Sequence, residues 1–150
     1  MTLEAGTPAP AFDLPATDDG RAALSGPTVL FFYPKADTPG CTNEAIDFTA
    51  NADAFRSAGV TVIGLSRDPV KKLDRFKAKH DLNVILASDE DGAVCEAYGV
   101  WVEKKLYGRT YMGVERATFL TDGAGVVRQV WRKVSVKGHA EAVLAAAKEL

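Results

Sequence analysis

The most regular hydrophobic pattern in the chain is a continuous apolar run at residues 28–33, followed by a second mainly apolar segment at residues 60–66. Runs without polar alternation are typical of strands that are buried on both faces of a sheet. Between them, apolar residues recur at helical spacing, at Ala45, Phe48, Ala52 and Phe55. This spacing predicts a helix over residues 41–58, closed by Gly59. A strand, a helix and a second strand in this order predict a parallel βαβ unit.

The pattern after this unit continues to alternate between helix and strand. Asp68 and Pro69 are typical of a helix start, with Asp68 as the N-cap and Pro69 as the first helical residue. Residues 84–86 predict a short strand. Asp91 and Gly92 then lead into a short helix that runs through residue 97.

The last third of the chain predicts a hairpin and a closing helix. Residues 100–115 are mixed and aromatic, and Lys104 and Lys105 predict a surface loop there. Two apolar segments flank the Gly-containing turn at residues 121–125, which predicts a β-hairpin. An amphipathic helix over residues 140–147 ends the pattern.

Residues 7–20 differ from the rest because they contain three prolines. Phe12 and Leu14 stand at alternate positions, so this segment predicts an edge strand or extended arm that ends in a turn at residues 18–20. The whole order predicts an α/β fold with a mixed central sheet flanked by helices. A cysteine that starts a helix after a buried strand, followed by a hairpin and a C-terminal helix, gives this fold a thioredoxin-like layout.

Composition limits the partners more than it identifies the function. The 150 residues are 47% hydrophobic and 25% charged with a net charge of −2, as expected for one soluble domain over residues 1–150. There is no basic stripe for nucleic acid, and no apolar run approaches the roughly 18 residues of a membrane span. The N-terminus lacks the basic and apolar regions of a signal peptide. We therefore predict a cytoplasmic protein with no nucleic-acid or membrane partner.

The candidate chemistry lies at one of two cysteines, Cys41 and Cys95. Cys41 follows a loop with prolines and a glycine and stands at the predicted start of a helix. The positive end of a helix favours the thiolate, which is the nucleophilic form of cysteine. Cys95 lies in a short predicted helix, where the default expectation is a small buried hydrophobic residue.

Several familiar sites are excluded by spacing. A C-x-x-C pair is missing, because Thr38 and Glu44 stand three residues before and after Cys41. His80 and His139 are predicted at a helix end and a helix start, and with the two cysteines they do not have the spacing of zinc ligands. We expect no metal and no cofactor.

At this point the chain resembles a known family. The pattern Pro34-x-x-x-Thr38-x-x-Cys41 is similar to the P-x-x-x-[TS]-x-x-C signature of peroxiredoxins. The wider segment 33–42 resembles the bacterioferritin comigratory protein branch, and segment 113–120 resembles the part of that branch that carries the active-site arginine, here Arg116. The resemblance covers nearly the whole chain. It implies a thioredoxin-like fold with an N-terminal extension and a thiol-dependent peroxidase.

The resemblance also implies roles for individual residues. Cys41 attacks hydrogen peroxide or an organic hydroperoxide and becomes a sulfenic acid. Thr38, Arg116 and backbone N–H groups stabilise the charge that develops on the departing oxygen, and Pro34 shields the thiolate. For Glu44, one helical turn after Cys41, two roles stay open: positioning Arg116 or assisting proton transfer.

The chain departs from the branch where a second, resolving cysteine is expected. Those two positions hold Ile46 and Lys77, so only Cys95 remains. We predict a one-cysteine mechanism in which an external thiol (thioredoxin, glutaredoxin or glutathione) reduces the sulfenic acid. Resolution by Cys95 and an intermolecular disulfide stay open as alternatives, as does a peroxide sensor that signals through oxidation of Cys41. By analogy with the branch, we predict a monomer.

Overall fold

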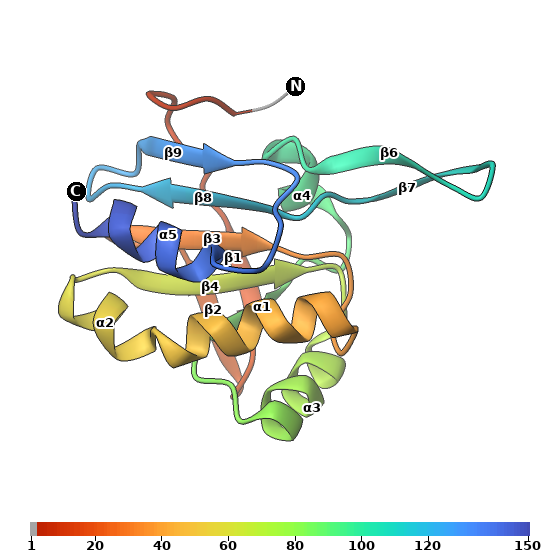
Figure 1. Cartoon of the computed structure of the whole chain (residues 1–150), viewed down its shortest axis with the longest axis horizontal. Helices are drawn as coiled ribbons and strands as arrows, with labels where there is room; N and C mark the ends of the chain where they lie inside the picture. The colour runs from red at the N-terminus through yellow and green to blue at the C-terminus, as the bar shows by residue number, and fades with distance from the viewer. Residues whose placement is uncertain (1–2) are drawn as a thin grey trace.

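A mixed seven-stranded sheet forms the centre of the molecule in the computed structural model, which describes residues 3–150. Its strands are β1 (Asp13–Ala16), β2 (Gly20–Ala23), β3 (Thr28–Phe32), β4 (Thr61–Ser66), β5 (Ile85–Ser88), β8 (Ala117–Thr121) and β9 (Val127–Trp131). They lie in the order β2-β1-β5-β4-β3-β8-β9 (Figure 1). The central strands β3, β4 and β5 are parallel, and the other pairs are antiparallel. The predicted mixed sheet is confirmed.

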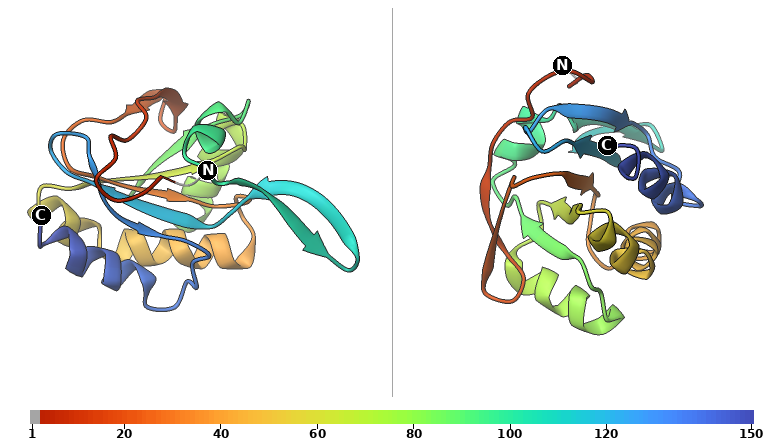
Figure 2. Two further views of the ribbon diagram at one scale, coloured as in Figure 1. Left: turned by 90° about the horizontal axis from the view of Figure 1, so that it is seen from above. Right: turned by 90° about the vertical axis from the view of Figure 1, so that its left-hand side faces the viewer.

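Helices cover the two faces of this sheet unequally. The helices are α1 (Pro39–Ala50), α2 (Ala52–Ser57), α3 (Val70–His80), α4 (Ala93–Ala97) and α5 (His139–Ala147). Residues of α1, α2, α3 and α5 share one buried cluster, and residues of α4 belong to a second cluster. The right panel of Figure 2 shows α1, α2 and α5 on one side of the sheet and α4 on the other.

The apolar run at residues 28–33, which contains β3, explains why each face of the sheet has a hydrophobic cluster. All five residues of β3 are buried. Val29 and Phe31 belong to the cluster with α1, and Leu30 and Phe32 belong to the cluster with α4. Because successive side chains of a strand point to opposite faces, one apolar strand contributes to two hydrophobic cores.

Two predicted helices differ from the structure in where they begin or end. The helix expected over residues 41–58 begins at Pro39 and is divided at Asn51, whose side-chain amide donates to the Asp47 carbonyl at 2.8 Å. The N-cap of α3 is Pro69 rather than Asp68. The Asp68 carboxylate instead accepts hydrogen bonds from the Ala36 N–H and the Ser66 hydroxyl.

The largest difference from the sequence-based prediction is in residues 100–115. They form an antiparallel hairpin, β6 (Trp101–Leu106) and β7 (Arg109–Val114), which projects from the body (Figures 1 and 2). Its two-residue turn, Tyr107 and Gly108, has positive φ at both positions, as a tight hairpin turn requires. Much of the arm is exposed, so its sequence lacks the alternation that marks a half-buried strand.

The ends of the chain follow the predictions more closely. The hairpin β8–β9 and the closing helix α5 are both present. The proline-rich arm contains β1, but residues 20–23 continue past the predicted turn as β2, which is the outer strand. No helix among the described residues is long and apolar enough to cross a membrane.

Candidate active site

Cys41 lies in the first turn of α1, at the C-terminal end of the parallel strands. After β3, the chain passes through a loop to Thr38, which is the N-cap of α1 with extended backbone angles (φ −96°, ψ 156°). Pro39 fits the first helical position because its missing N–H has no helical partner there. Cys41 is therefore the third helical residue, and only 1% of its surface is exposed. The unpaired N–H groups of this turn give its surroundings a partial positive charge.

Strand pairing brings Arg116 to this turn. Phe32 is the register partner of Ala117, so Arg116, just before β8, is level with the loop that follows β3. One guanidinium nitrogen, Nη2, donates to Cys41 Sγ at 3.3 Å. A Cβ atom on Gly40 would lie 3.1 Å from that same nitrogen, so the glycine allows the close approach. A cation in contact with sulfur favours the thiolate.

Glu44 joins the same group from the next turn of α1. Its Oε1 accepts from Arg116 Nη1 at 2.8 Å, and 1% of the residue is exposed. Its Oε2 has no hydrogen-bond partner within residues 3–150. Burial raises the pKa of Glu44 to about 7, although Arg116 acts in the opposite direction. Burial opposes the charge of Arg116, but the charges of Cys41 and Glu44 outweigh it and raise the Arg116 pKa, so the guanidinium remains charged.

Thr38 and Pro34 flank this group. The Thr38 hydroxyl donates to the Lys35 carbonyl at 2.8 Å, which braces the loop between them. Although Thr38 is the N-cap residue, its hydroxyl accepts no hydrogen bond from the N–H groups of the helix. Pro34 is half-buried and lines a groove beside the loop. The site residues expected from the sequence thus lie on one loop and the first two turns of α1, with Arg116 added from just before β8.

Two further residues near the site, Asp37 and Tyr33, had no role predicted from the sequence. Asp37, in the loop, pairs with Lys79 Nζ and His80 Nε2, each at 2.9 Å, and so ties the loop to the end of α3. Hydrogen bonds from His80 and Lys79 hold the Asp37 pKa below its ordinary value. Tyr33 places its hydroxyl in the core, and burial raises its pKa above the ordinary range. These contacts join residues far apart in sequence, so no local pattern could have identified them.

His139 packs in the core against α1 and β8. It starts α5 as predicted, and its Nε2 lies 2.8 Å from the Thr118 hydroxyl. The rings of Phe48 and Trp131 meet it edge-on. Burial and the charge of Arg116 lower the His139 pKa to about 4, so it is neutral at physiological pH.

Cys95 occupies a different environment. It is fully buried in the cluster with Phe32 and Tyr98, on the face of the sheet opposite the cluster that contains Cys41. A disulfide needs Cα atoms within about 7 Å, and here the sheet separates the two sulfurs. Burial and the Asp89 carboxylate raise the pKa of Cys95 well above its ordinary range. Cys95 is thus a core residue in this conformation.

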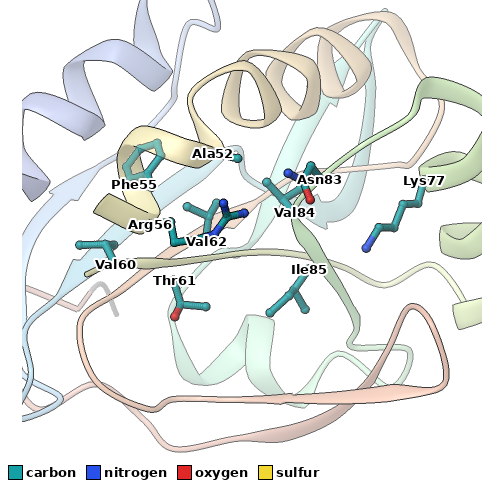
Figure 3. Close-up of a pocket in the computed structure, with 10 residues that line it drawn as sticks. All are labelled: Ala52, Phe55, Arg56, Val60, Thr61, Val62, Lys77, Asn83, Val84 and Ile85. Atoms are coloured by element: carbon teal, nitrogen blue, oxygen red, sulfur yellow. The ribbon is translucent and has the colours of Figure 1, made fainter. Parts of the chain in front are cut away.

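A pocket at the other end of the sheet is separate from this site. It has a volume of about 300 Å³ and lies between α2 and the N-terminal ends of β4 and β5 (Figure 3). Both cations that line it have carboxylate partners, Arg56 with Asp53 and Lys77 with Asp18, each at 2.8 Å. Its lining contains neither a cysteine nor Arg116.

Comparisons with known proteins identify the family of this chain. Residues 5–130 match the model of the AhpC/TSA family. Peroxiredoxin Bcp of Xanthomonas campestris is 48% identical over 147 residues, covering 94% of this chain and 92% of the relative. Peroxiredoxin Bcp of Escherichia coli is 45% identical over 146 residues, covering 95% and 94%.

Solved structures give the same result. The bacterioferritin comigratory protein of Xanthomonas campestris, described for its alkyl peroxide reduction activity, superimposes with a TM-score of 0.90 at 44% identity, covering 97% of this chain and 98% of that one. A mutant of Xylella fastidiosa PrxQ gives 0.93 at 34% identity, covering 99% and 98%. The chain therefore belongs to the AhpC/TSA family and has a thioredoxin-like fold. Within it, the chain is a thiol-dependent peroxidase of the Bcp, or PrxQ, type.

Proposed function

We propose that Cys41 is the nucleophile with which this protein reduces hydrogen peroxide and organic hydroperoxides. The Cys41 thiolate attacks one peroxide oxygen, an S–O bond forms and the O–O bond breaks. The departing oxygen takes a proton and leaves as water or an alcohol, and Cys41 becomes a sulfenic acid. The contact between Arg116 Nη2 and Cys41 Sγ, at 3.3 Å, is the observation that carries this proposal.

The groups around Cys41 can stabilise the negative charge that moves from sulfur to oxygen during this step. Negative charge passes from sulfur to the departing oxygen, so donors that are already in place lower the barrier. In our proposal Arg116 and the N–H groups of the first turn of α1 follow that charge. The Thr38 hydroxyl joins them by turning its proton from the Lys35 carbonyl to the peroxide. Pro34 limits the access of water to the sulfur.

Glu44 acts on the reaction through Arg116. Its hydrogen bond to Nη1 fixes the guanidinium while Nη2 faces the sulfur, which makes Glu44 a positioning residue. Its unpartnered Oε2 and a pKa of about 7 also suit a reversible proton store beside the site.

The recycling step is proposed to use an external thiol. Cys95 lies on the opposite face of the sheet, and Ile46 and Lys77 occupy the other positions at which a resolving cysteine was expected. Thioredoxin, glutaredoxin and glutathione are the thiol classes considered. The reductant must then reach Cys41 itself.

Mass spectrometry after one equivalent of hydrogen peroxide, without reductant, tests this proposal. We expect sulfenic or sulfinic acid on Cys41 and a free Cys95. An intramolecular disulfide between Cys41 and Cys95 contradicts the one-cysteine mechanism. Turnover separates an enzyme from a peroxide sensor: with excess thiol, consumption of only about one equivalent of peroxide contradicts the enzymatic role.

The proposal also includes the oligomeric state and the cellular location of the protein. We predict a monomer, from the resemblance to the branch, and a cytoplasmic location, where thiols remain reduced. Light scattering coupled to size-exclusion chromatography measures the first, and a dimer in both the reduced and the oxidised protein contradicts it.

A further inference from the structure

A groove of about 450 Å³ lies between the active-site loop and the β6–β7 hairpin. Pro34 and Lys35 of the loop line one side, and residues 111–114 of β7 line the other. The projecting hairpin therefore forms a wall beside the approach to Cys41.

The groove has an excess of positive charge. Three of its lining residues are cations, Lys35, Arg67 and Lys104, and one, Glu90, is a carboxylate. Arg67 is fixed by its position 4.4 Å above the Trp101 ring and by a hydrogen bond to the Glu90 carbonyl. Among the residues that the structure describes, no carboxylate forms an ion pair with Lys35 or Lys104. The pocket in Figure 3 differs, because its cations are paired.

Lys104 connects this groove to the catalytic centre. A Cβ atom on Gly113 would lie 3.2 Å from Lys104 Cδ, so the lysine stem crosses β7 at the glycine. Burial and the charge of Arg116 lower the Lys104 pKa, while Cys41 and Glu115 act in the opposite direction. Lys104 has no ion-pair partner among the described residues, so an anion bound in the groove would stabilise this half-buried cation.

The reductant has to reach a buried sulfur. Cys41 is 1% exposed, and Cys95 lies on the far face of the sheet. Cys95 therefore cannot form a disulfide with Cys41 that a reductant could attack at the surface. A small thiol can follow the path that a peroxide takes. A thiol on a folded protein needs the first turn of α1 to open first.

We propose that the reductant of Cys41 is a low-molecular-weight anionic thiol whose carboxylate is held by Lys35 and Lys104 in this groove. The inference rests on the proposed function. The thiol sulfur attacks the Cys41 sulfenic sulfur, an S–S bond forms, the S–O bond breaks and water leaves with the thiol proton. A second thiol attacks the small thiol's sulfur in this mixed disulfide and releases the Cys41 thiolate. Two thiols are thereby oxidised to one disulfide, and Cys41 gains two electrons.

Single-turnover kinetics with two matched thiols test the proposal. Cys41 is first oxidised with one equivalent of hydrogen peroxide, and the loss of sulfenic acid is then followed with reduced glutathione or with glutathione diethyl ester, which lacks free carboxylates. We expect the ratio of the two rate constants to fall about 3- to 10-fold in the K35M/K104M double variant, the range expected for two exposed ion pairs. The intrinsic reactivities of the two thiols cancel when this ratio is compared between proteins.

Lys105 provides the matched control. It precedes the turn on the same strand, but successive side chains of a strand face opposite sides, and it does not line the groove. The K105M variant should keep the wild-type ratio. An unchanged ratio in K35M/K104M overturns the proposal, as does rapid reduction by thioredoxin with no preference for glutathione over its ester.

Two other outcomes distinguish a failure of this inference from a failure of the proposed function. If K35M/K104M slows sulfenic acid formation by a carboxylate-bearing hydroperoxide and leaves the thiol ratio unchanged, the groove serves the substrate and the proposal is wrong. If no sulfenic acid forms with hydrogen peroxide, the proposed function fails first, and this inference fails with it.

Discussion

The two cysteines occupy the same local position in two different helices. Cys41 is the third residue of α1 and Cys95 the third residue of α4, and each helix follows a strand of the sheet. Both residues are buried, with 1% and 0% of their surfaces exposed. Neither burial nor the place in the helix therefore distinguishes a nucleophile from a core residue.

The difference lies in the charged partner that each one meets. Arg116, just before β8, donates to Cys41 Sγ. At α4, Asp89 accepts from the backbone N–H groups of Val94 and Cys95, at 3.1 and 2.7 Å. The carboxylate consumes the free donors of that helix and places negative charge beside the thiol. A cation and free donors make one thiol a candidate nucleophile, while an anion and filled donors make the other inert.

Replacing each cysteine with serine should give the largest difference in peroxidase activity. The C41S variant should lose peroxidase activity by about 10³-fold or more, because the proposed nucleophile is gone. The C95S variant should keep most of it. Peroxide consumption with excess thiol measures both, and circular dichroism checks that C95S is folded. Loss of most activity in a folded C95S variant would contradict the assignment of Cys95 as a core residue.

Removing the cation from Cys41 should give the next largest effect. The R116M variant should slow sulfenic acid formation by about 10²- to 10³-fold, the usual effect of losing one donor to a developing charge. R116K should recover only part of this rate, because a single ammonium cannot match a guanidinium that contacts Cys41 and Glu44 together. Stopped-flow mixing with hydrogen peroxide measures the step, and equal rates in R116M and wild type would remove Arg116 from the mechanism.

The stability of the protein should depend on pH through two buried groups, Glu44 and His139. Burial raises the Glu44 pKa from 4.5 to about 7, so the folded protein holds a proton that the unfolded chain has released. This term makes the free energy of unfolding fall by about 3 kcal/mol as the pH rises from 4.5 to 7. Burial and Arg116 lower the His139 pKa from 6.5 to about 4, which makes the free energy of unfolding rise with pH over nearly the same range.

Two variants separate these opposing terms. Relative to wild type, E44Q should gain stability as the pH rises between about 4.5 and 7, because the falling term is gone. H139Q should show the opposite difference. Urea unfolding at several pH values measures both, and parallel curves for E44Q and wild type would show that Glu44 has an ordinary pKa.

The smallest expected effect is at the other cysteine. D89N keeps one accepting oxygen but leaves one N–H at the start of α4 unpaired, at a cost of about 1–3 kcal/mol in stability. The rate of sulfenic acid formation should not change, since Asp89 lies with Cys95 on the face away from Cys41. Urea unfolding and peroxide kinetics together check this. A slower reaction with hydrogen peroxide would show that the two faces are coupled.

The prediction of the fold succeeded where burial leaves a periodic signal. The strands of the βαβ unit, the β8–β9 hairpin and α5 follow apolar runs, helical spacing or turn residues, which local sequence contains. It failed at β6 and β7, because an exposed arm has no buried face and its residues show no period. The break at Asn51 was also missed, since it depends on one side-chain bond within an otherwise regular apolar pattern.

The sequence by itself determined the strand, the loop and the helix that hold Cys41, because adjacent residues build them and the signature Pro34-x-x-x-Thr38-x-x-Cys41 lies within that segment. Only the tertiary structure decided which charge each thiol meets. Arg116 reaches Cys41 across 75 residues through the pairing of β3 with β8. The separation of Cys41 from Cys95 was likewise decided by the sheet between them, since the face on which a helix packs depends on the path of the whole chain.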